Sequence, residues 1–217
     1  MSELRGALGA VFYGAAGIYT KSLAFVTGDN VTNSEGLIVT SGFSGGQKIS
    51  VYGSTSNDGN YEIDSVSATK ITITAASFTA ETPASSVFIY TSSPGTQLAG
   101  FFDWSINKSM TVLEATDFAD AGTKTYIAGD KGWTATASMH WMDDDLTAAS
   151  YFGEPMMVRF FTKYSAAPSA PAPVYLYEGL AVVTGLTTEV NVGAIVEQPL
   201  TFTGVSPLVY RALTAYP

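Results

Sequence analysis

The strongest constraint on the fold is the alternation of apolar and polar side chains over residues 133–141, where Trp, Ala, Ala, Met and Trp alternate with Thr, Thr, Ser and His. Successive side chains of a strand point to opposite faces, so the pattern predicts a half-buried β-strand. Residues 102–106 alternate in the same way, which predicts a second strand on the same core face. The candidate core aromatics are Trp104, Trp133 and Trp141.

Composition favours strands over helices along the rest of the chain. The 217 residues include 21 Gly, 12 Tyr and 12 Phe, and 46% are hydrophobic, which is enough for a sizeable core. One helix is expected after residue 141, because Asp143, Asp144 or Asp145 can cap it and Gly153 can end it. We therefore predict a mainly β protein with one short flanking helix.

Residues 27–91 differ in character and are expected to form an inserted β-meander module. They are rich in Ser, Thr, Asn and Gly, with short apolar runs separated by turn residues. The predicted strands in this module are 37–39, 49–52, 61–66, 71–73 and 87–90. Residues 1–26 and 92–217 are assigned to the main β domain, with strands near its start and at 156–164, 174–184 and 190–203.

The charge balance excludes some classes of function. Acidic residues number 19 against 10 basic ones, a formal net charge of -9, which disfavours tight phosphate binding. The chain has no cysteine, so disulfides and thiolate metal sites are excluded. The apolar stretch 7–19 is interrupted by glycines and follows Glu3, so we expect a first strand there rather than a signal peptide.

No residue combination predicts an enzyme, a metal or a cofactor. His140 is the single histidine and has no GxSxG motif to accompany it, so an exposed or interface role is favoured over catalysis. Asp143–Asp145 lack the spacing of a calcium loop, and Gly42–Gly46 lack the lysine of a phosphate loop. Glu114, Asp117 and Asp120 could form a glycosidase-like carboxylate set, but acids in a polar link are usually solvated.

A family resemblance is carried by the order of four segments: RGALGAVFYG, then GFFDWSINKSMTVLEATDFADAGTKTYIAGDKGWTATASMHW, then the acid-capped helix, then VYLYEGLAVVTGLTTEVNVGAIVEQPLTFTGVSPL. This order resembles the major tail tube proteins of bacteriophages with long non-contractile tails. The resemblance covers about residues 4–14 and 96–208. The segment between them is similar to small β modules inserted in phage structural proteins.

The resemblance implies a fold, an assembly and a set of partners. The fold is a tail-tube-type β-sandwich or barrel, and the assembly is a stack of hexameric rings in the virion, built from subunits made in the host cytoplasm. Double-stranded DNA passes through the tube without specific binding, and no membrane is involved. The implied partners are further copies of this chain and the tape measure, tail terminator and distal tail proteins.

The resemblance also implies roles for particular segments. Residues 114–131 match the long loop that contacts an adjacent ring, and the inserted module is expected outside the tube. Candidate lumen or inter-ring acids are Glu114, Asp117, Asp120 and Asp130. An acidic or neutral lining suits the passage of a polyanion, because it avoids multiple phosphate contacts.

Two other readings remain open at the level of sequence. Another virion component, such as a tail terminator, a tail-completion protein or a capsid decoration protein, shares the composition but builds no tube. A carbohydrate-binding or adhesive β-sandwich would present its Tyr and Trp side chains as an exposed sugar platform. A hydrolase is disfavoured for want of a paired nucleophile and base.

Overall fold

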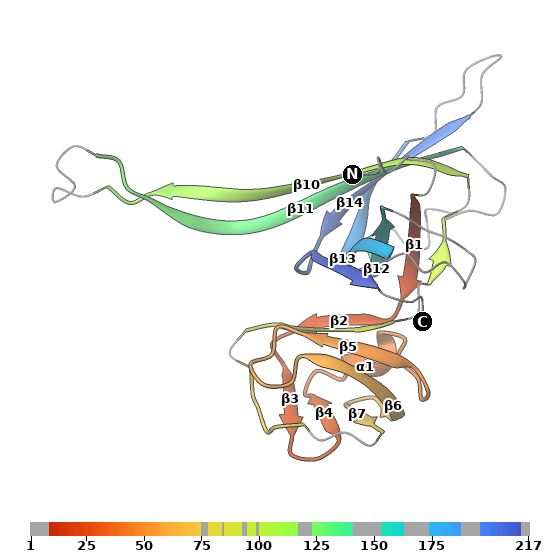
Figure 1. Ribbon diagram of the computed structural model, residues 1–217, viewed down its shortest axis with the longest axis vertical. Coiled ribbons are helices and arrows are strands. Elements are labelled where there is room, and N and C mark those ends of the chain that lie inside the picture. The colour runs from red at the N-terminus through yellow and green to blue at the C-terminus, as the bar shows by residue number, and fades with distance from the viewer. Residues whose placement is uncertain are drawn as a thin grey trace.

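The computed structural model describes residues 9–74, 78–83, 85–92, 95–98, 100–116, 123–140, 153–162, 174–187 and 196–213. Within them the chain is mainly β and forms two antiparallel sheets, each with its own hydrophobic core. The prediction of a mainly β protein is therefore confirmed. Figure 1 shows the two sheets as separate units, which we call the body and the module, and a long hairpin that projects from the body.

The body is one eight-stranded sheet with the order β10-β11-β14-β13-β12-β1-β9, and β15 pairs with β13 off this path. Its strands are β1 (Ala10–Ala15), β9 (Thr96–Gln97), β10 (Phe101–Glu114), β11 (Tyr126–His140), β12 (Met156–Phe161), β13 (Val174–Leu186), β14 (Glu197–Gly204) and β15 (Val209–Leu213). The resemblance implies two facing sheets, whereas hydrogen bonding joins all these strands into one.

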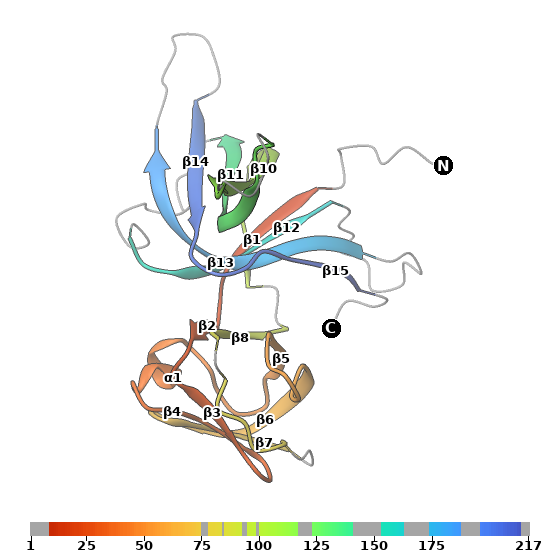
Figure 2. The same cartoon turned by 90° about the vertical axis from the view of Figure 1, so that its left-hand side faces the viewer.

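Strand β13 explains how one sheet encloses a core. Its first half pairs with β12 and β15 and its second half with β14, and the register shifts between Val183 and Gly185. Such a shift bends and twists a strand. Figure 2 shows β13 running through both halves of the curved body. Side chains from β1, β11, β12, β13 and β14 therefore share one core, in which the Phe160 and Phe202 rings meet edge to face at 5.9 Å.

The module is a seven-stranded sheet with the order β2-β8-β5-β6-β7-β4-β3. Its elements are β2 (Gly17–Thr20), β3 (Leu23–Val26), β4 (Asn30–Asn33), α1 (Leu37–Thr40), β5 (Lys48–Tyr52), β6 (Gly59–Ser67), β7 (Lys70–Ile73) and β8 (Val87–Thr91). It is not a simple meander, because β8 returns to lie between β2 and β5. The strands that enter and leave the module are thus neighbours, with Gly17 opposite Tyr90.

Several boundaries differ from the sequence-based expectations. Strands β2 and β3 belong to the module sheet, so that sheet begins at Gly17 rather than at residue 27. The predicted strand 37–39 is the one-turn helix α1, where Asn33 Oδ1 accepts the amide of Leu37 at 3.0 Å and so favours a turn. The predicted helix after residue 141 and residues 190–195 of the predicted strand 190–203 lie outside the described residues.

The module is held against the body by an apolar cluster. Phe88 and Tyr90 of β8 pack with Met157 of β12, Leu180 of β13 and Val209 of β15. Gly17 lies so close to Leu180 that an added Cβ would be 3.1 Å from its Cδ2 atom. The contact fixes the module beside the body, on the convex side of the curved hairpin (Figure 1).

Candidate assembly surface

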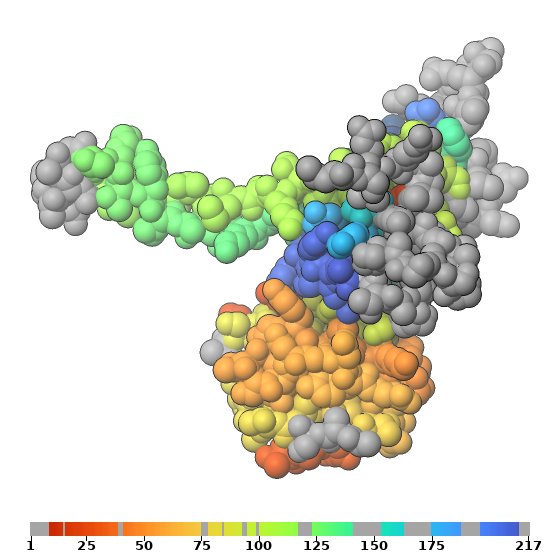
Figure 3. Space-filling view, in the orientation of Figure 1, coloured from red at the N-terminus to blue at the C-terminus, as the bar shows by residue number. Residues whose placement is uncertain are grey.

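The most exposed part of the fold is the outer portion of the hairpin β10–β11, residues 109–114 and 126–132, which we call the arm. The inner portion packs on the body: Trp104 and Ile106 face the core opposite Ala137 and Ala135. In the arm, every residue of the two strands is exposed except Gly129, which is half-buried. Figure 3 shows the arm standing clear of both body and module.

The arm carries apolar side chains on both faces. Five of its large hydrophobic residues are 49–57% exposed: Met110, Val112, Leu113, Tyr126 and Ile127. Leu113 pairs with Ile127 on one face, and Val112 pairs with Ala128 on the other. A two-stranded ribbon is marginally stable alone, and contiguous exposed apolar surface is typical of an interaction site. The arm therefore has the properties of a surface that another chain covers.

A bulge shapes the arm. The register shifts between Met110 and Val112, so that Thr111 lies opposite Gly129 and Asp130. Thr111 Oγ1 donates a hydrogen bond of 3.3 Å to the Asp130 carbonyl. The Thr111 side chain also leaves no room for a Cβ at position 129, which glycine occupies. Bulges increase strand twist, and the ribbon curves along its length in Figure 1.

The candidate acids occupy different parts of the arm region. Glu114 is exposed at the end of β10, where Lys124 Nζ lies 2.8 Å from its Oε2 atom and Thr116 Oγ1 donates to its Oε1 atom at 3.1 Å. Asp130 is exposed on β11, closer to the body. Asp117 and Asp120 lie outside the described residues. The structure thus places Glu114 and Asp130 on one exposed ribbon but at opposite ends of it.

The three candidate core aromatics also differ. Trp133 is buried in the body core, and its Nε1 donates a hydrogen bond of 2.7 Å to the Ser206 carbonyl. Trp104 is half-buried and packs on Phe160, with ring centroids 5.6 Å apart. Trp141 lies outside the described residues. Phe102, predicted to share the core face, is instead 47% exposed because it is the extra residue of a bulge between Phe101 and Asp103.

The remaining candidates for catalysis or ligand binding are His140, the glycines near α1 and Asp143–Asp145. His140 is half-buried and stacks on Phe102, with ring centroids 4.6 Å apart. Gly42 and Gly46 have φ values of 82° and 80° in the turns after α1, conformations that glycine adopts readily. Asp143–Asp145 lie outside the described residues. Across the described part of the chain, no group of three or more His, Asp or Glu residues is arranged to hold a metal ion.

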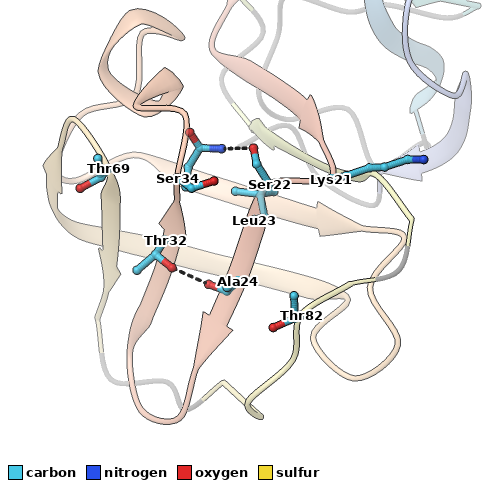
Figure 4. A pocket seen from close by; sticks show the side chains of 9 residues that line it. Lys21, Ser22, Leu23, Ala24, Thr32, Ser34, Thr69 and Thr82 are labelled. Carbon is cyan, nitrogen blue, oxygen red and sulfur yellow. Dashed lines mark hydrogen bonds between the residues drawn. The ribbon is translucent and has the colours of Figure 1, made fainter.

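A small depression on the module is lined mainly by polar side chains, among them Ser22, Thr32 and Thr69 (Figure 4). Asn33 Nδ2 donates to Ser22 Oγ at 2.8 Å, and Thr32 Oγ1 donates to the Ala24 carbonyl at 3.3 Å. These hydrogen bonds join β4 to Ala24 of β3 and to Ser22, the residue before β3. The depression is therefore explained by strand pairing.

A buried ionic cluster joins strands of the body to the module. Glu178 of β13 is fully buried, and its Oε2 accepts from Arg159 Nε at 3.1 Å. Arg211 Nε lies 2.5 Å from Glu178 Oε1, in an ion pair whose angle departs from that of a hydrogen bond. Arg211 Nη1 also donates to Ser50 Oγ at 3.2 Å, and Arg159 Nη2 donates to the Thr91 carbonyl. The cluster therefore links three body strands to β5 and β8.

Tyr90 lies against this cluster and is electrostatically coupled to it. The Arg211 guanidinium is 5.3 Å from the centroid of the Tyr90 ring. Burial raises the pKa of the Tyr90 hydroxyl well above 10, and the negative charge of Glu178 raises it further. The hydroxyl is thus neutral over the physiological pH range.

No family model matches the chain, and a search of the curated proteins finds no match either. Among the described residues, no helix has the length and apolar character needed to cross a membrane. The structure and the residues themselves must therefore carry any functional proposal.

Sequence reasoning missed the arm and the ionic cluster. Residues 114–131 were expected to be a link, but β11 already begins at Tyr126, and the bulge at Thr111 breaks the period-2 pattern. The signal that was present is a pair of adjacent apolar residues on each side of the acidic segment, at 112–113 and 126–127. For the cluster, the signal was a single charge within each apolar strand, as in MMVRFF.

Proposed function

We propose that this chain is the tail tube subunit of a bacteriophage with a long non-contractile tail. It polymerises as stacked hexameric rings into a hollow virion tube through which DNA enters the host cell. The observation that carries the proposal is the arm, which exposes apolar side chains on both faces. A monomer gains nothing from such a ribbon, whereas repeated contacts between copies would bury it.

The asymmetry of the subunit supports open-ended assembly. The arm projects from one side of the body (Figure 1), which leaves other surfaces of a second copy, such as its body or module, free to cover it. Contacts of this heterologous kind generate closed rings or propagating stacks. Each contact can be modest because it repeats around and along the tube.

The charge of the chain supports the passage of DNA rather than its binding. The formal net charge is -9, and two of the three arginines, Arg159 and Arg211, are engaged by Glu178. Multiple phosphate contacts would raise DNA affinity steeply. A lining with few free cations would let the polyanion slide.

Negative-stain electron microscopy of the purified chain at several concentrations, together with its mass in solution, tests the proposal. We expect hollow tubes or six-membered rings from the natural sequence. Leu113→Ser with Ile127→Ser should abolish them, while Val26→Ser with Leu37→Ser on the module should not. Single closed rings without stacking would point instead to a tail terminator or tail-completion protein.

A further inference from the structure

The sheet of the module has two edge strands, β3 and β2, and they differ in how the chain covers them. Beyond β3, the Phe25 amide donates to the Glu81 carbonyl at 2.8 Å and the Glu81 amide donates back at 3.0 Å, while Phe78 bridges to Gly28. Beyond β2, no described segment pairs with the outer side of the strand. Because an unpaired strand edge is a template for another strand, native proteins usually cover or protect it. The free edge of β2 is therefore a candidate binding site.

The hydrogen-bond pattern identifies the backbone groups on the free edge. The Thr91 amide donates to the Ala16 carbonyl at 2.9 Å, next to the ladder between β2 and β8. Bonded pairs alternate along antiparallel strands, so Gly17 and Tyr19 direct their N–H and C=O groups away from β8. No described residue forms a hydrogen bond with these groups. The edge thus offers donors and acceptors in the spacing that an extended chain matches.

The free edge opens onto a cleft of about 720 Å³ between the module and the body. The body contributes residues 154–157, Leu180 and Val205, and the module contributes β2 and residues around α1. Figure 2 shows β2 on the side of the module that faces the body. A strand added beside β2 would lie about 4.8 Å from it. Such a strand would occupy this cleft.

The walls of the cleft define the side chains that an added strand needs. Gly17 faces the body, since a Cβ there would lie 3.1 Å from Leu180 Cδ2. Side chains alternate along a strand, so every second one of the added strand would meet the body, where Met156, Leu180 and Val205 are apolar. Glu154 is exposed in the same cleft and forms no ion pair with a described residue. The complementary segment has alternating apolar side chains and a lysine or arginine.

We propose that the free edge of β2 binds an extended basic segment of a partner protein by strand addition. The backbone of the segment forms hydrogen bonds with Gly17 and Tyr19. Its apolar side chains pack on Leu180 and Val205, and its lysine or arginine pairs with Glu154. The inference goes beyond the proposed function, because it uses neither the arm nor a stack of rings.

The shape and charge of the site favour a partner protein over a second copy of this chain. The edge is recessed beside residues 154–157, so a single extended segment can enter, whereas the edge of another folded sheet would bring its own body against this wall. The formal net charge of -9 also makes two copies repel each other and attracts a basic segment.

A synthetic peptide tests the site on the full-length chain. The probe is an end-blocked, fluorescein-labelled peptide of about six residues, the length of an ordinary strand, in which valine and lysine alternate. Its control has the same side chains but a methyl group on every backbone nitrogen, so it cannot donate the hydrogen bonds of a strand. Fluorescence anisotropy should show saturable binding of the probe and about tenfold or more weaker binding of the control.

Matched variants test the walls of the cleft. Glu154→Lys and Val205→Ser should each weaken binding of the probe about three- to tenfold, through lost charge pairing and lost apolar contact. The controls are Glu62→Lys and Val26→Ser, at exposed module positions outside the cleft, and they should bind the probe like the natural chain. Circular dichroism checks that each variant is folded.

Hydrogen exchange followed by mass spectrometry locates the bound probe. Protection should appear in fragments that contain residues 17–20, where the amides of Gly17 and Tyr19 gain partners. Protection confined to other strands, equal binding of the methylated control, or no saturable binding up to about 1 mM would each overturn the proposal. A solution mass that falls to that of a monomer in Val205→Ser alone would show that a second copy occupies the edge, and would also overturn it. None of these readouts depends on tube formation, so this proposal and the tail tube proposal can fail separately.

Discussion

The indole Nε1 of Trp133 donates a hydrogen bond of 2.7 Å to the carbonyl oxygen of Ser206, at the turn that connects β14 to β15. The indole lies against the backbone of Gly204 and Gly179, and a Cβ at either position would overlap its ring. One side chain thus ties the root of the hairpin to two other strands of the body. The close approach of the indole to the backbone requires glycine at both positions, 179 and 204.

Gly204→Ala is expected to destabilise the body. The added methyl group must displace the buried Trp133 ring, which costs about 1–3 kcal/mol of unfolding free energy in a well-packed core. Gly132→Ala is the matched control on the exposed ribbon, where the nearest atom to the new Cβ is Ser109 Oγ at 3.6 Å. Urea unfolding measures both. Equal midpoints for the two variants would contradict the packing described for Trp133.

The body is easier to predict from the sequence than the arm, because packing on a core imposes a pattern on its strands. Residues 133–139 alternate because one face packs on a core, and Trp133, Ala135, Ala137 and Met139 are all buried. The arm has no such face within one chain. Its side chains are exposed on both faces, so periodicity carries little information there.

A bulge and a local side-chain hydrogen bond account for two other differences between the predicted and the observed structure. Phe102 is the extra residue of a bulge, so its side chain points away from the core face on which strict alternation would place it. The period-2 pattern of the sequence cannot reveal such a bulge. Helix α1 follows Asn33, whose side chain accepts the amides of Glu35 and Leu37. That local hydrogen bonding outweighed the strand propensity of the Leu37–Val39 segment. For the candidate acids, sequence alone could place Glu114 beside a turn but not on a projecting ribbon.

Glu178→Gln is expected to be strongly destabilising. The substitution removes the buried negative charge between two guanidinium groups, and breaking a buried ion pair in this way costs about 3–5 kcal/mol. Glu114→Gln is the comparison, since its pair with Lys124 is exposed and worth about 0–1 kcal/mol. Denaturant unfolding of the two variants measures the difference. Similar small losses in both would mean that the buried cluster contributes little.

Tyr90 is expected to make stability fall at alkaline pH. Burial, and then the Glu178 charge, raise its pKa in the folded state above the value of 10 for a free tyrosine. Its contribution is therefore complete below about pH 10 and is lost as pH rises above that value, because the unfolded chain releases the proton first. Tyr90→Phe should flatten the fall in stability between about pH 9 and about pH 11. Tyr52→Phe, at an exposed position, should leave the fall unchanged.

Glu81 is expected to have the opposite dependence, at acid pH. Its carboxylate accepts the amides of Thr55 at 2.7 Å and Ser56 at 3.1 Å, and Asn57 Nδ2 at 2.9 Å. Partial burial raises the pKa of this carboxyl, but the hydrogen bonds outweigh burial, and the net pKa lies below 4.5.

A lowered pKa means that the Glu81 contribution is present above about pH 4.5 and is lost as pH falls through the folded-state value. Glu81→Gln should therefore lose stability at about pH 7 and converge on the natural chain at about pH 3. Glu62→Gln, at an exposed position on β6, is the control and should track the natural chain throughout. Thermal unfolding across this pH range measures the effect. A gap between Glu81→Gln and the natural chain that stays constant with pH would show that the loop depends on the shape of the Glu81 side chain rather than on its charge.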